Sequence, residues 1–428
     1  MKRRAYECRR YLEKTQWMKK RELQRLKLKR LKALLKYAYE NVPYYHEAFR
    51  NSNFKPDDFR GLKDLHRVPI LKKQTIRKNL EQLLAKNFPK KKRICRFTTG
   101  TTATPVKFYR DKRDVSWGIG AELRGYGWAG YEVGDKLALI WNIRPELSTS
   151  FNFKIENLWR RCNILNIRDL SEKSMESFAR RLQAFQPDFI RGHSGATNIF
   201  ATFLLQNDHI KIHPRAIFTS CDSLLPQYRG VIREAFNCKV YNYYACAEVS
   251  HIAAQCGQHE GLHIFEENIV VETVKDGEST APEEDGHVLL TNLHSFAMPF
   301  IRYEIGDSGK ILSDACSCGR ELTLLKLIGR INEYFANSDG SFTFLKDFQR
   351  FFEDLPVQDF QIIQEHCDEI FIKIMPGANY TEAHTRFILR NIRLLGPEKI
   401  KVELVDSIPP GKTGKIRHLV SKVATKYT

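Results

Sequence analysis

Apolar and polar positions in the middle of the chain follow one another with two alternating periods. Short apolar runs predict strands, and amphipathic segments between them predict helices. Strands that alternate with helices favour a parallel sheet with crossover helices, in which ligands lie at the carboxyl ends of strands. The predicted strands are 134–141 (after an initial turn), 187–193, 215–220 and 239–244, and the predicted helices are 171–185 (with Ser171 as N-cap), 195–206 and 224–236.

The pattern differs at both ends of the chain. Leucines at near-helical spacing over residues 2–36 predict an amphipathic helix, which ends ahead of Pro43. Short helices and a loop are expected over 62–90, and a helix over 114–128 with Asp114 as its cap. Residues 262–312 read as short strands with Gly/Asp turns. Beyond Gly329, strands at 360–364, 369–374 and 399–405 surround a helix at 380–395.

These elements predict an α/β protein. It would have a large N-terminal domain of mixed and parallel sheets with crossover helices and a β-rich portion, plus a small mobile C-terminal α+β domain. The expected divisions are a basic helical segment over 1–40, a large domain over 41–330, and a small C-terminal domain over 331–428. The 428 residues are ample for a large buried core.

Composition narrows the class of protein. No run of eighteen apolar residues exists and the N-terminus lacks an apolar signal segment, so neither a transmembrane segment nor secretion is expected. The ten cysteines show no dense framework, which is typical of reduced thiols in the cytoplasm.

The net charge of +19 favours anionic partners. Fifteen Lys/Arg fall in residues 2–36, which could lie on nucleic acid or an anionic membrane. We favour a solvated helix packed by its leucine stripe, because base-stacking aromatics are not interleaved with the charges.

A stretch rich in hydroxyls is the first candidate for chemistry. It runs Thr98-Thr99-Gly100-Thr101-Thr102-Ala103-Thr104-Pro105, between two strand-like segments. Gly100 lets a ligand approach the backbone, and the hydroxyl and N–H donors suit phosphate oxygens. A polar hairpin turn is the alternative. It is not a Walker A loop, because no Gly-Lys-Ser/Thr closes it.

Four further segments each have a functional and an ordinary interpretation. Glu248, after a strand, could ligate Mg²⁺ or be an exposed loop acid. Asp307 could accept both ribose hydroxyls or sit in a hairpin turn. Arg330 could contact phosphate or ribose, or be a surface charge. Lys415 lies in the glycine-containing loop 409–417, which could also be a solvated hairpin.

The order of these segments along the chain resembles the adenylate-forming superfamily of acyl-CoA synthetases and adenylation domains. Within it, the chain looks most like the phenylacetate–CoA ligase branch, particularly its capsular-polysaccharide and coenzyme F-390 synthetase-like members. The features that favour this branch are the short chain, Asn41-Val42-Pro43-Tyr44-Tyr45, Phe300-Ile301-Arg302-Tyr303-Glu304-Ile305-Gly306-Asp307 and Cys316-Ser317-Cys318-Gly319-Arg320. The resemblance covers roughly residues 33–428.

The resemblance implies ATP, Mg²⁺ and CoA as cofactors. It makes 41–330 the large nucleotide- and acyl-binding domain and 331–428 a small lid domain, and it assigns a role to each segment. Residues Thr98, Thr99, Gly100, Thr101 and Thr102 would hold the β- and γ-phosphates of ATP. Tyr244 would stack on adenine and Glu248 would bind Mg²⁺. Asp307 and Arg330 would hold the ribose, and Asn332 stands at the hinge. Lys415 would bridge the substrate carboxylate and the α-phosphate, and His193 and Ser194 would lie beside the acyl pocket.

A zinc site is a separate expectation. Thiolate and imidazole ligands are available from Cys256, His263, Cys316 and Cys318, with His259 as an alternative to His263. Four unrelated reduced residues are the other interpretation. Because some relatives in this branch carry zinc at matching positions, the resemblance implies structural Zn²⁺ with four protein ligands and no open position for water.

The leading hypothesis is an acid–thiol ligase that adenylates a small carboxylic acid and passes the acyl group to CoA, another thiol or an amine. Adenylation with amide or ester transfer and no CoA is the alternative within the class. A basic zinc-containing nucleic-acid-binding protein is the rival from another class, although nucleic acid is not the expected partner. Ala103 and Ala247 depart from the family pattern, so a member that binds nucleotide without turnover is a third reading. The chain could assemble as a dimer.

Overall fold

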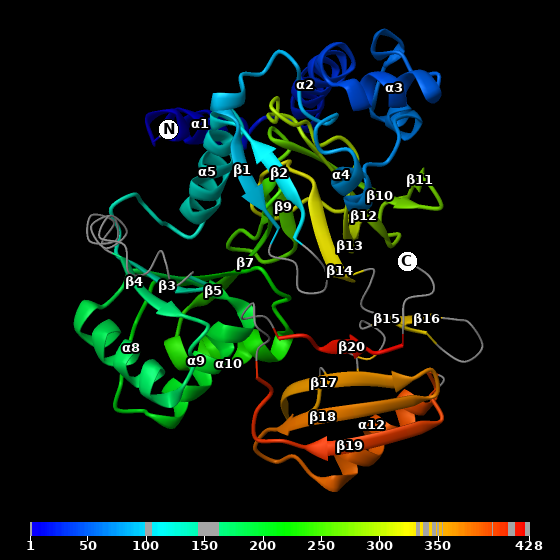
Figure 1. The fold of residues 1–428 in the computed structure, drawn as a ribbon. Helices are drawn as coiled ribbons and strands as arrows, with labels where there is room; N and C mark the ends of the chain where they lie inside the picture. The colour runs from blue at the N-terminus through cyan, green and yellow to red at the C-terminus, as the bar shows by residue number, and fades with distance from the viewer. Residues whose placement is uncertain are drawn as a thin grey trace. The chain divides into compact units, whose positions relative to one another are not determined.

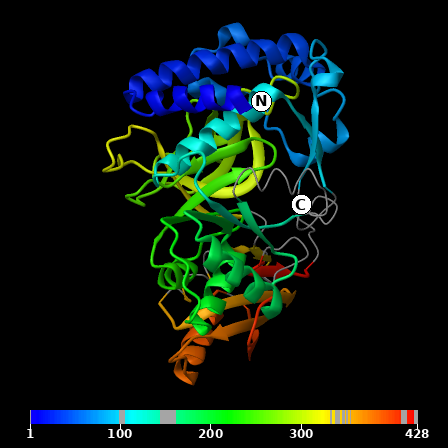
Figure 2. The ribbon, with the colours of Figure 1, turned by 90° about the vertical axis from the view of Figure 1, so that its left-hand side faces the viewer.

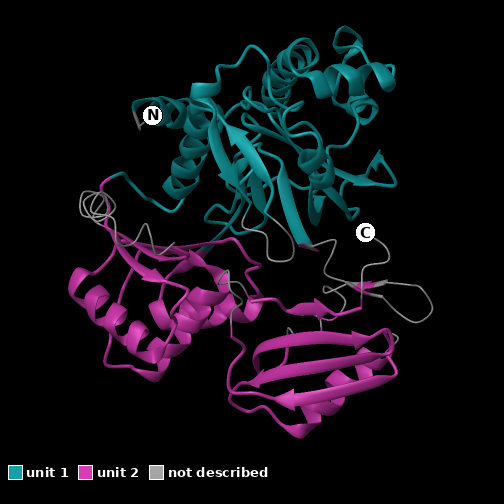
Figure 3. Ribbon diagram, viewed as in Figure 1, with its two compact units in different colours: residues 1–133, 241–328 teal, residues 134–240, 329–428 magenta. Residues whose placement is uncertain are grey.

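The computed structural model describes residues 2–98, 105–143, 162–330, 334–336, 342–344, 348, 351–352, 354–395, 397–409 and 416–423. The chain divides into two compact units, each made of two separated segments (Figure 3). Unit 1 comprises residues 1–133 and 241–328, and unit 2 comprises 134–240 and 329–428. Among the described helices, none is both long enough and apolar enough to cross a membrane.

Unit 1 combines N-terminal helices with a largely antiparallel sheet of strand order β11-β10-β12-β13-β14-β9-β8-β7 (Figure 1). Its helices are α1 (Lys2–Thr15), α2 (Lys20–Asn41), α3 (Pro43–Asn51), α4 (Lys73–Lys78) and α5 (Lys112–Gly127), with short 3-10 turns at Pro56–Asp58, Leu62–Arg67 and Lys90–Lys92. Its strands are β1 (Ile94–Phe97), β2 (Lys107–Arg110), β7 (Lys239–Cys246), β8 (Ser250–Ala254), β9 (Leu262–Ile264), β10 (Ile269–Lys275), β11 (Glu278–Ser279), β12 (Gly286–Asn292), β13 (Tyr303–Ile311) and β14 (Leu324–Arg330).

Unit 2 contains a parallel sheet of order β6-β5-β3-β4 and a separate four-stranded sheet of order β19-β18-β17-β20. The first sheet, with its helices, is made by β3 (Leu137–Trp141), β4 (Cys162–Asn166), α8 (Glu172–Phe185), β5 (Phe189–His193), α9 (Ser194–Gln206), β6 (Ala216–Ser220) and α10 (Pro226–Phe236). The C-terminal part holds β15 (Tyr334–Ala336), β16 (Phe342–Phe344), β17 (Val357–His366), β18 (Glu369–Pro376), α12 (Glu382–Arg393), β19 (Lys399–Leu404) and β20 (Leu419–Ser421). The α/β prediction, with a β-rich portion and a C-terminal α+β part, is confirmed.

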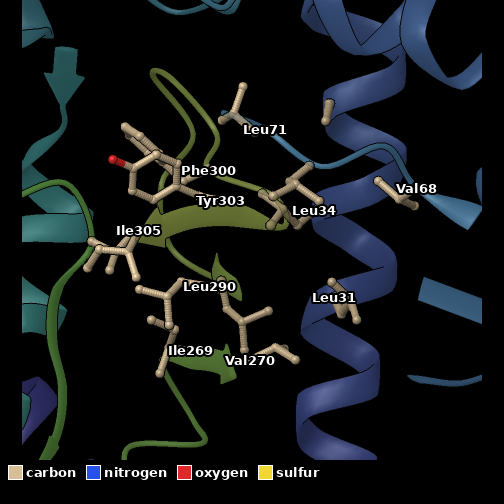
Figure 4. Packing of buried hydrophobic residues seen from close by; sticks show 14 of the residues in the cluster. Leu31, Leu34, Val68, Leu71, Ile269, Val270, Leu290, Phe300, Tyr303 and Ile305 are labelled. Atoms are coloured by element: carbon tan, nitrogen blue, oxygen red, sulfur yellow. The ribbon is translucent and has the colours of Figure 1, made fainter. Parts of the chain in front are cut away.

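Each unit has its own apolar core. In unit 1, leucines on the inner side of α2 pack against residues of β10, β12 and β13, as Figure 4 shows for Leu31, Leu34, Val270 and Leu290. The predicted leucine stripe is therefore buried. In unit 2, residues of α8, α9 and α10 share one core with strands of both sheets, including Ile362 and Leu419. Removal of this apolar surface from water is the main force that assembles each unit.

The N-terminal segment forms two helices rather than the single predicted one. The Gln16 side chain, which accepts hydrogen bonds from Trp128 Nε1 (2.7 Å) and Arg320 Nε (3.0 Å), lies at the break. The second helix then begins where the Glu22 carboxylate accepts from Lys19 N at 3.1 Å. Tertiary partners decide this break, so leucine spacing alone did not reveal it. Figure 2 shows α1 and α2 side by side, and the Arg30 guanidinium lies 5.3 Å from the Tyr11 ring.

The predicted N-cap of α5 was wrong by three residues. Asp111 is the cap, because its carboxylate accepts from Arg113 N (2.8 Å) and Asp114 N (3.0 Å). Asp114 is instead a buried partner of Arg110, at 2.5 and 2.8 Å, and of Asn292, at 2.9 Å. The cap at Ser171 of α8 is confirmed.

One buried arginine fixes the start of β13. The side chain of Arg302 is 2% exposed, and its Nε lies 3.1 Å from Glu272 Oε1. Its terminal nitrogen donates to His66 O (2.9 Å) and Val68 O (2.8 Å). The segment that follows Val68 then pairs with β13, since Leu71 N donates to Arg302 O at 3.0 Å. Arg302 thus joins the 3-10 turn at Leu62–Arg67 to β10 and β13.

We expect Arg302→Met to lower the free energy of unfolding by about 3–5 kcal/mol, because it leaves the buried Glu272 carboxylate unpaired. Urea denaturation measures this loss. Arg180→Met is the matched control: Arg180 pairs with Glu176 on the surface, where its side chain is 69% exposed, and its loss is expected to cost less than about 1 kcal/mol. Equal effects of the two substitutions would contradict the role given to Arg302.

Candidate active site

The hydroxyl-rich stretch begins at the end of a two-stranded ribbon, as predicted. Strands β1 and β2 pair antiparallel, with Phe97 opposite Lys107. Thr98 N donates to Val106 O at 3.0 Å, and Val106 N donates to the Thr98 hydroxyl at 2.9 Å. These two bonds close the base of the loop. Residues 99–104, including the predicted phosphate ligands Thr99, Gly100, Thr101 and Thr102, lie outside the described residues.

The predicted adenine and ribose residues lie together in unit 1. Tyr244 is near the end of β7 and Asp307 is in β13. The Tyr244 hydroxyl donates to Asp307 Oδ2 at 2.7 Å, although the two residues are 63 positions apart. Gly306, with φ of +92°, precedes Asp307 in a backbone conformation that other residues rarely adopt. The close approach of β7 and β13 side chains therefore groups two residues from separate motifs.

The predicted magnesium ligand lies just beyond the end of β7, the strand that carries Tyr244. Glu248 follows β7 and is 5% exposed, and Glu248 Oε1 accepts a hydrogen bond of 2.6 Å from the Tyr303 hydroxyl. Burial first, and then the charge of Glu248, raises the pKa of Tyr303, so its phenol stays a donor. The bond fixes one oxygen of a buried carboxylate. An Mg²⁺ ion accepts such a carboxylate oxygen, so the residue type fits the predicted ion.

Sequence reasoning assigned no role to Tyr303. Its position just after Arg302 and four residues before Asp307 was the available signal, but a buried tyrosine in a strand is usually a core residue. The structure shows that its ring is buried while its hydroxyl contacts the Glu248 carboxylate. Arg302, whose side chain is fixed by its bonds to Glu272, His66 and Val68, directly precedes this tyrosine and the strand.

The predicted acyl-pocket residues lie in unit 2, at the turn between β5 and α9. Here an aspartate that the sequence reasoning missed, Asp222, caps the helix: its two carboxylate oxygens accept from Ser194 N (2.9 Å) and Gly195 N (2.8 Å). The His193 ring lies with Nδ1 3.9 Å from Asp222 and packs edge-on against Trp141. The position of Asp222, two residues after strand β6, was the only signal for it.

The C-terminal segment adjoins this turn within unit 2. A Cβ built on Gly195 would lie 3.0 Å from Ile416 Cδ1, so the described residue next to Lys415 packs on the start of α9. Farther along, His418 Nε2 lies 2.9 Å from the Tyr228 hydroxyl and 3.1 Å from Asp359 Oδ1, all three buried. Lys415 and Asn332 lie outside the described residues. Arg330 is the last residue of β14.

The four predicted zinc ligands form one cluster in unit 1. The ligand atoms of Cys256, His263, Cys316 and Cys318 all lie within 4.8 Å of one another. The Cys256 and Cys316 sulfurs are 3.5 Å apart, and Cys318 Sγ is 3.4 Å from His263 Nε2. Tetrahedral zinc with Zn–S bonds of about 2.3 Å places sulfurs about 3.8 Å apart. The alternative ligand His259 lies beside Gln255 and Tyr241 instead.

Electrostatics at the cluster also suit a cation. Burial and then Arg320 lower the pKa of His263 to about 4, which keeps the imidazole neutral and able to bind a metal. Burial raises the pKa of the Cys256 and Cys316 thiols, so thiolates there need a compensating positive charge. The donor set therefore fits zinc with all four positions taken by protein ligands.

Comparisons with known proteins agree with this architecture. A family model described as the CapK C-terminal domain matches residues 335–422. The chain is 22% identical to protein CapK of Staphylococcus aureus over 424 residues, 94% of this chain and 90% of that protein. It is 29% identical to phenylacetate-coenzyme A ligase of Escherichia coli (strain K12) over 301 residues, 68% of each chain.

A solved structure of 2-hydroxyisobutyryl-CoA ligase in the postadenylation state has the same fold, with a TM-score of 0.77 and 20% identity over 95% of this chain and 91% of that one. The predicted resemblance is thus confirmed over nearly the whole sequence. Over most of its length this chain is similar to CapK and the phenylacetate–CoA ligases, and its fold is that of the adenylate-forming CoA ligases.

Proposed function

We propose that this protein is an ATP-dependent ligase that converts a small carboxylic acid to an acyl adenylate and then transfers the acyl group to CoA. The observation that carries the proposal is the 2.7 Å hydrogen bond between Tyr244 and Asp307. The buried Glu248 follows Tyr244 closely in the sequence. Together they group residues that the family resemblance assigns to adenine, ribose and metal. The fold and the relatives support the same chemistry.

Each residue of the unit 1 group has a physical task in binding nucleotide. The Tyr244 ring offers a face on which adenine stacks, and its hydroxyl orients the Asp307 carboxylate. That carboxylate accepts hydrogen bonds from ribose hydroxyls. Thr98 and the loop that follows it, 99–102, offer hydroxyl and N–H donors to the β- and γ-phosphates. The family resemblance also assigns Arg330, the last residue of β14, to the ribose.

In the first half-reaction, the acid's carboxylate oxygen forms a bond to the α-phosphorus. The bond from that phosphorus to the bridging oxygen breaks, and pyrophosphate leaves. Two anions must meet, so the site needs positive charge, which Lys415 supplies as a mobile point charge. Mg²⁺, held by Glu248, would offset the charge of the phosphates when it is bound. His193 and Ser194 would border the acyl group.

Packing in unit 2 supports the proposed role of Lys415. Ile416 packs on Gly195, next to His193 and Ser194, and a Cβ on Gly195 would lie 3.0 Å from Ile416 Cδ1 and 3.1 Å from Asp222 Oδ2. We propose that residues 331–428 act as a lid domain whose loop brings Lys415 to the acid, and that 41–330 bind nucleotide and acyl group. A mobile lid allows Lys415 to leave before the second half-reaction.

In the second half-reaction, a thiolate attacks the acyl carbon and AMP leaves with its electron pair. CoA is the favoured thiol because the similar proteins named above include CoA ligases. An amide or ester product without CoA is the alternative. We further propose that the protein is cytoplasmic and that the cluster at Cys256 binds a structural Zn²⁺, which holds the segment after β13 to the β8–β9 connection.

ATP–pyrophosphate exchange is first measured with a panel of aryl, fatty, amino and sugar acids, and the best acid is chosen. With that acid, we expect Lys415→Ala to lower the exchange rate by about a hundredfold or more, because the variant loses one group that stabilises the charge of the transition state. Lys412→Ala, in the same loop, is the control and should keep the rate within about twofold, since the family resemblance gives Lys412 no role. Full exchange in Lys415→Ala would refute its role. Absence of exchange with every acid, together with ATP binding, would favour a non-catalytic member.

Substitution of Glu248 should act on magnesium dependence. Glu248→Gln removes the negative charge and is expected to raise the Mg²⁺ concentration for half-maximal exchange by about tenfold or more. Tyr303→Phe removes only the hydrogen bond to Glu248, and a smaller rise of about threefold to tenfold is expected. Measurement of exchange against Mg²⁺ concentration tests both, and an unchanged Mg²⁺ requirement in Glu248→Gln would exclude it as the ligand.

The zinc proposal predicts about one zinc per chain by elemental analysis of protein purified without added metal. Cys316→Ser should lose most of this zinc and unfold at lower temperature, whereas Cys367→Ser, outside the cluster, should keep both. Zinc-free protein with unchanged stability would show that the four residues hold no structural metal.

A further inference from the structure

A hollow in unit 1 has an unusual lining, which includes none of the predicted nucleotide residues. Its volume is about 300 Å³, and three arginines line it from three different helices: Arg4 from α1, Arg30 from α2 and Arg113 from α5. The rings of Tyr11 and Trp117 form apolar walls between them. No role in the proposed ligase reaction requires this hollow.

Among the described residues, no carboxylate is in direct contact with these arginines, although Glu267 and Asp111 act at longer range on Arg30 and Arg113. In the part of the chain that the structure describes, no carboxylate lies within 4 Å of the guanidinium nitrogens of these three residues. Glu7, the one acid on the wall, lies 3.3 Å from Arg3, and Glu267 is paired with Arg124 at 2.7 Å. The hollow is therefore a local concentration of positive charge.

The three arginines that line the hollow also act on the same two neighbouring groups. The pKa of His294 is lowered well below its ordinary value, first by burial and then by the charges of Arg30, Arg113 and Arg4. The same three arginines act on the Cys8 thiol, against the burial that raises its pKa. Burial and then the charge of Arg4 lower the pKa of Arg113. Like charges held close together favour an anion among them.

Aromatic rings hold two of the arginines in position. The Arg30 guanidinium lies 4.8 Å from the centre of the Trp117 ring and 5.3 Å from that of Tyr11, and its NH1 donates to Glu267 O. Trp117 is itself stacked on His294 at 4.2 Å, and the Arg113 guanidinium lies 4.9 Å from the Phe296 ring. Such stacking restricts the guanidiniums before any ligand arrives, which reduces the entropy lost on binding.

We propose that this hollow binds a phosphate monoester. A phosphate monoester carries up to two negative charges and three oxygens, which the planar donor forks of arginine match. A volume of 300 Å³ exceeds what a phosphate group alone needs, so a small organic group fits beside it. The phosphate can come from a soluble metabolite or from a lipid headgroup, and both sources present the same chemistry to the arginines.

Calorimetric titration with glycerol 3-phosphate tests the site, with glycerol as the uncharged comparison ligand. We expect saturable binding of glycerol 3-phosphate to the wild-type protein, weakened by about tenfold or more in Arg113→Met and in Arg4→Met, because each loses one charge-assisted contact. Arg25→Met and Lys29→Met are matched controls: both residues are exposed on α2 and do not line the hollow. The controls should bind as the wild type does.

Sedimentation with vesicles that contain phosphatidic acid distinguishes the sources. Binding to vesicles that is lost in Arg113→Met, without binding of soluble glycerol 3-phosphate, assigns the site to a lipid headgroup, and the reverse assigns it to a metabolite. The proposal is overturned if neither probe binds, or if the control variants weaken binding as much as Arg113→Met does. Unchanged ATP–pyrophosphate exchange in Arg4→Met would show that the fold is intact and that this site is separate from the ligase site.

Discussion

The buried guanidinium of Arg302 is the constraint on which the unit 1 site depends. It bonds Glu272 in β10 and the carbonyls of His66 and Val68, while its backbone nitrogen donates to Thr291 Oγ1 at 2.9 Å. Three other segments of unit 1 thus meet at this one residue. Tyr303 follows it directly and Asp307 lies five residues on, so the position of both depends on how the strand begins.

Both halves of the unit 1 site follow one physical scheme, in which a tyrosine hydroxyl donates to a carboxylate. Tyr244 fixes Asp307 and Tyr303 fixes Glu248, at 2.7 and 2.6 Å. A carboxylate that is already oriented loses less freedom when a ligand binds. The turn at His193 follows a related scheme, since the Asp222 carboxylate fixes the backbone of Ser194 and Gly195. In both units, hydrogen bonds to a buried or half-buried carboxylate therefore fix the local geometry.

More of the fold than of the contacts within it could be predicted from the sequence. Alternation of strands and helices was enough to predict the parallel sheet of unit 2, and the Ser171 cap was correct because capping depends on neighbouring backbone. The Asp114 cap was wrong because two aspartates lie three positions apart, and Arg110 and Asn292 decide which of them is free to cap. Likewise, Trp128 and Arg320 contact Gln16 at the break between α1 and α2.

By itself, the sequence determined the class of fold, the leucine stripe that α2 buries and the residues that could serve as ligands, since local periodicity and side-chain chemistry carry that information. Only the tertiary structure decided which of those residues meet. It paired Tyr244 with Asp307 and brought four candidate metal ligands within 4.8 Å of one another. It also revealed Tyr303 as the partner of Glu248 and Asp222 as the partner of Ser194. It also gathered Arg4, Arg30 and Arg113 from three helices around one hollow. Contacts between residues far apart in a chain depend on how whole elements pack, and no local pattern records that.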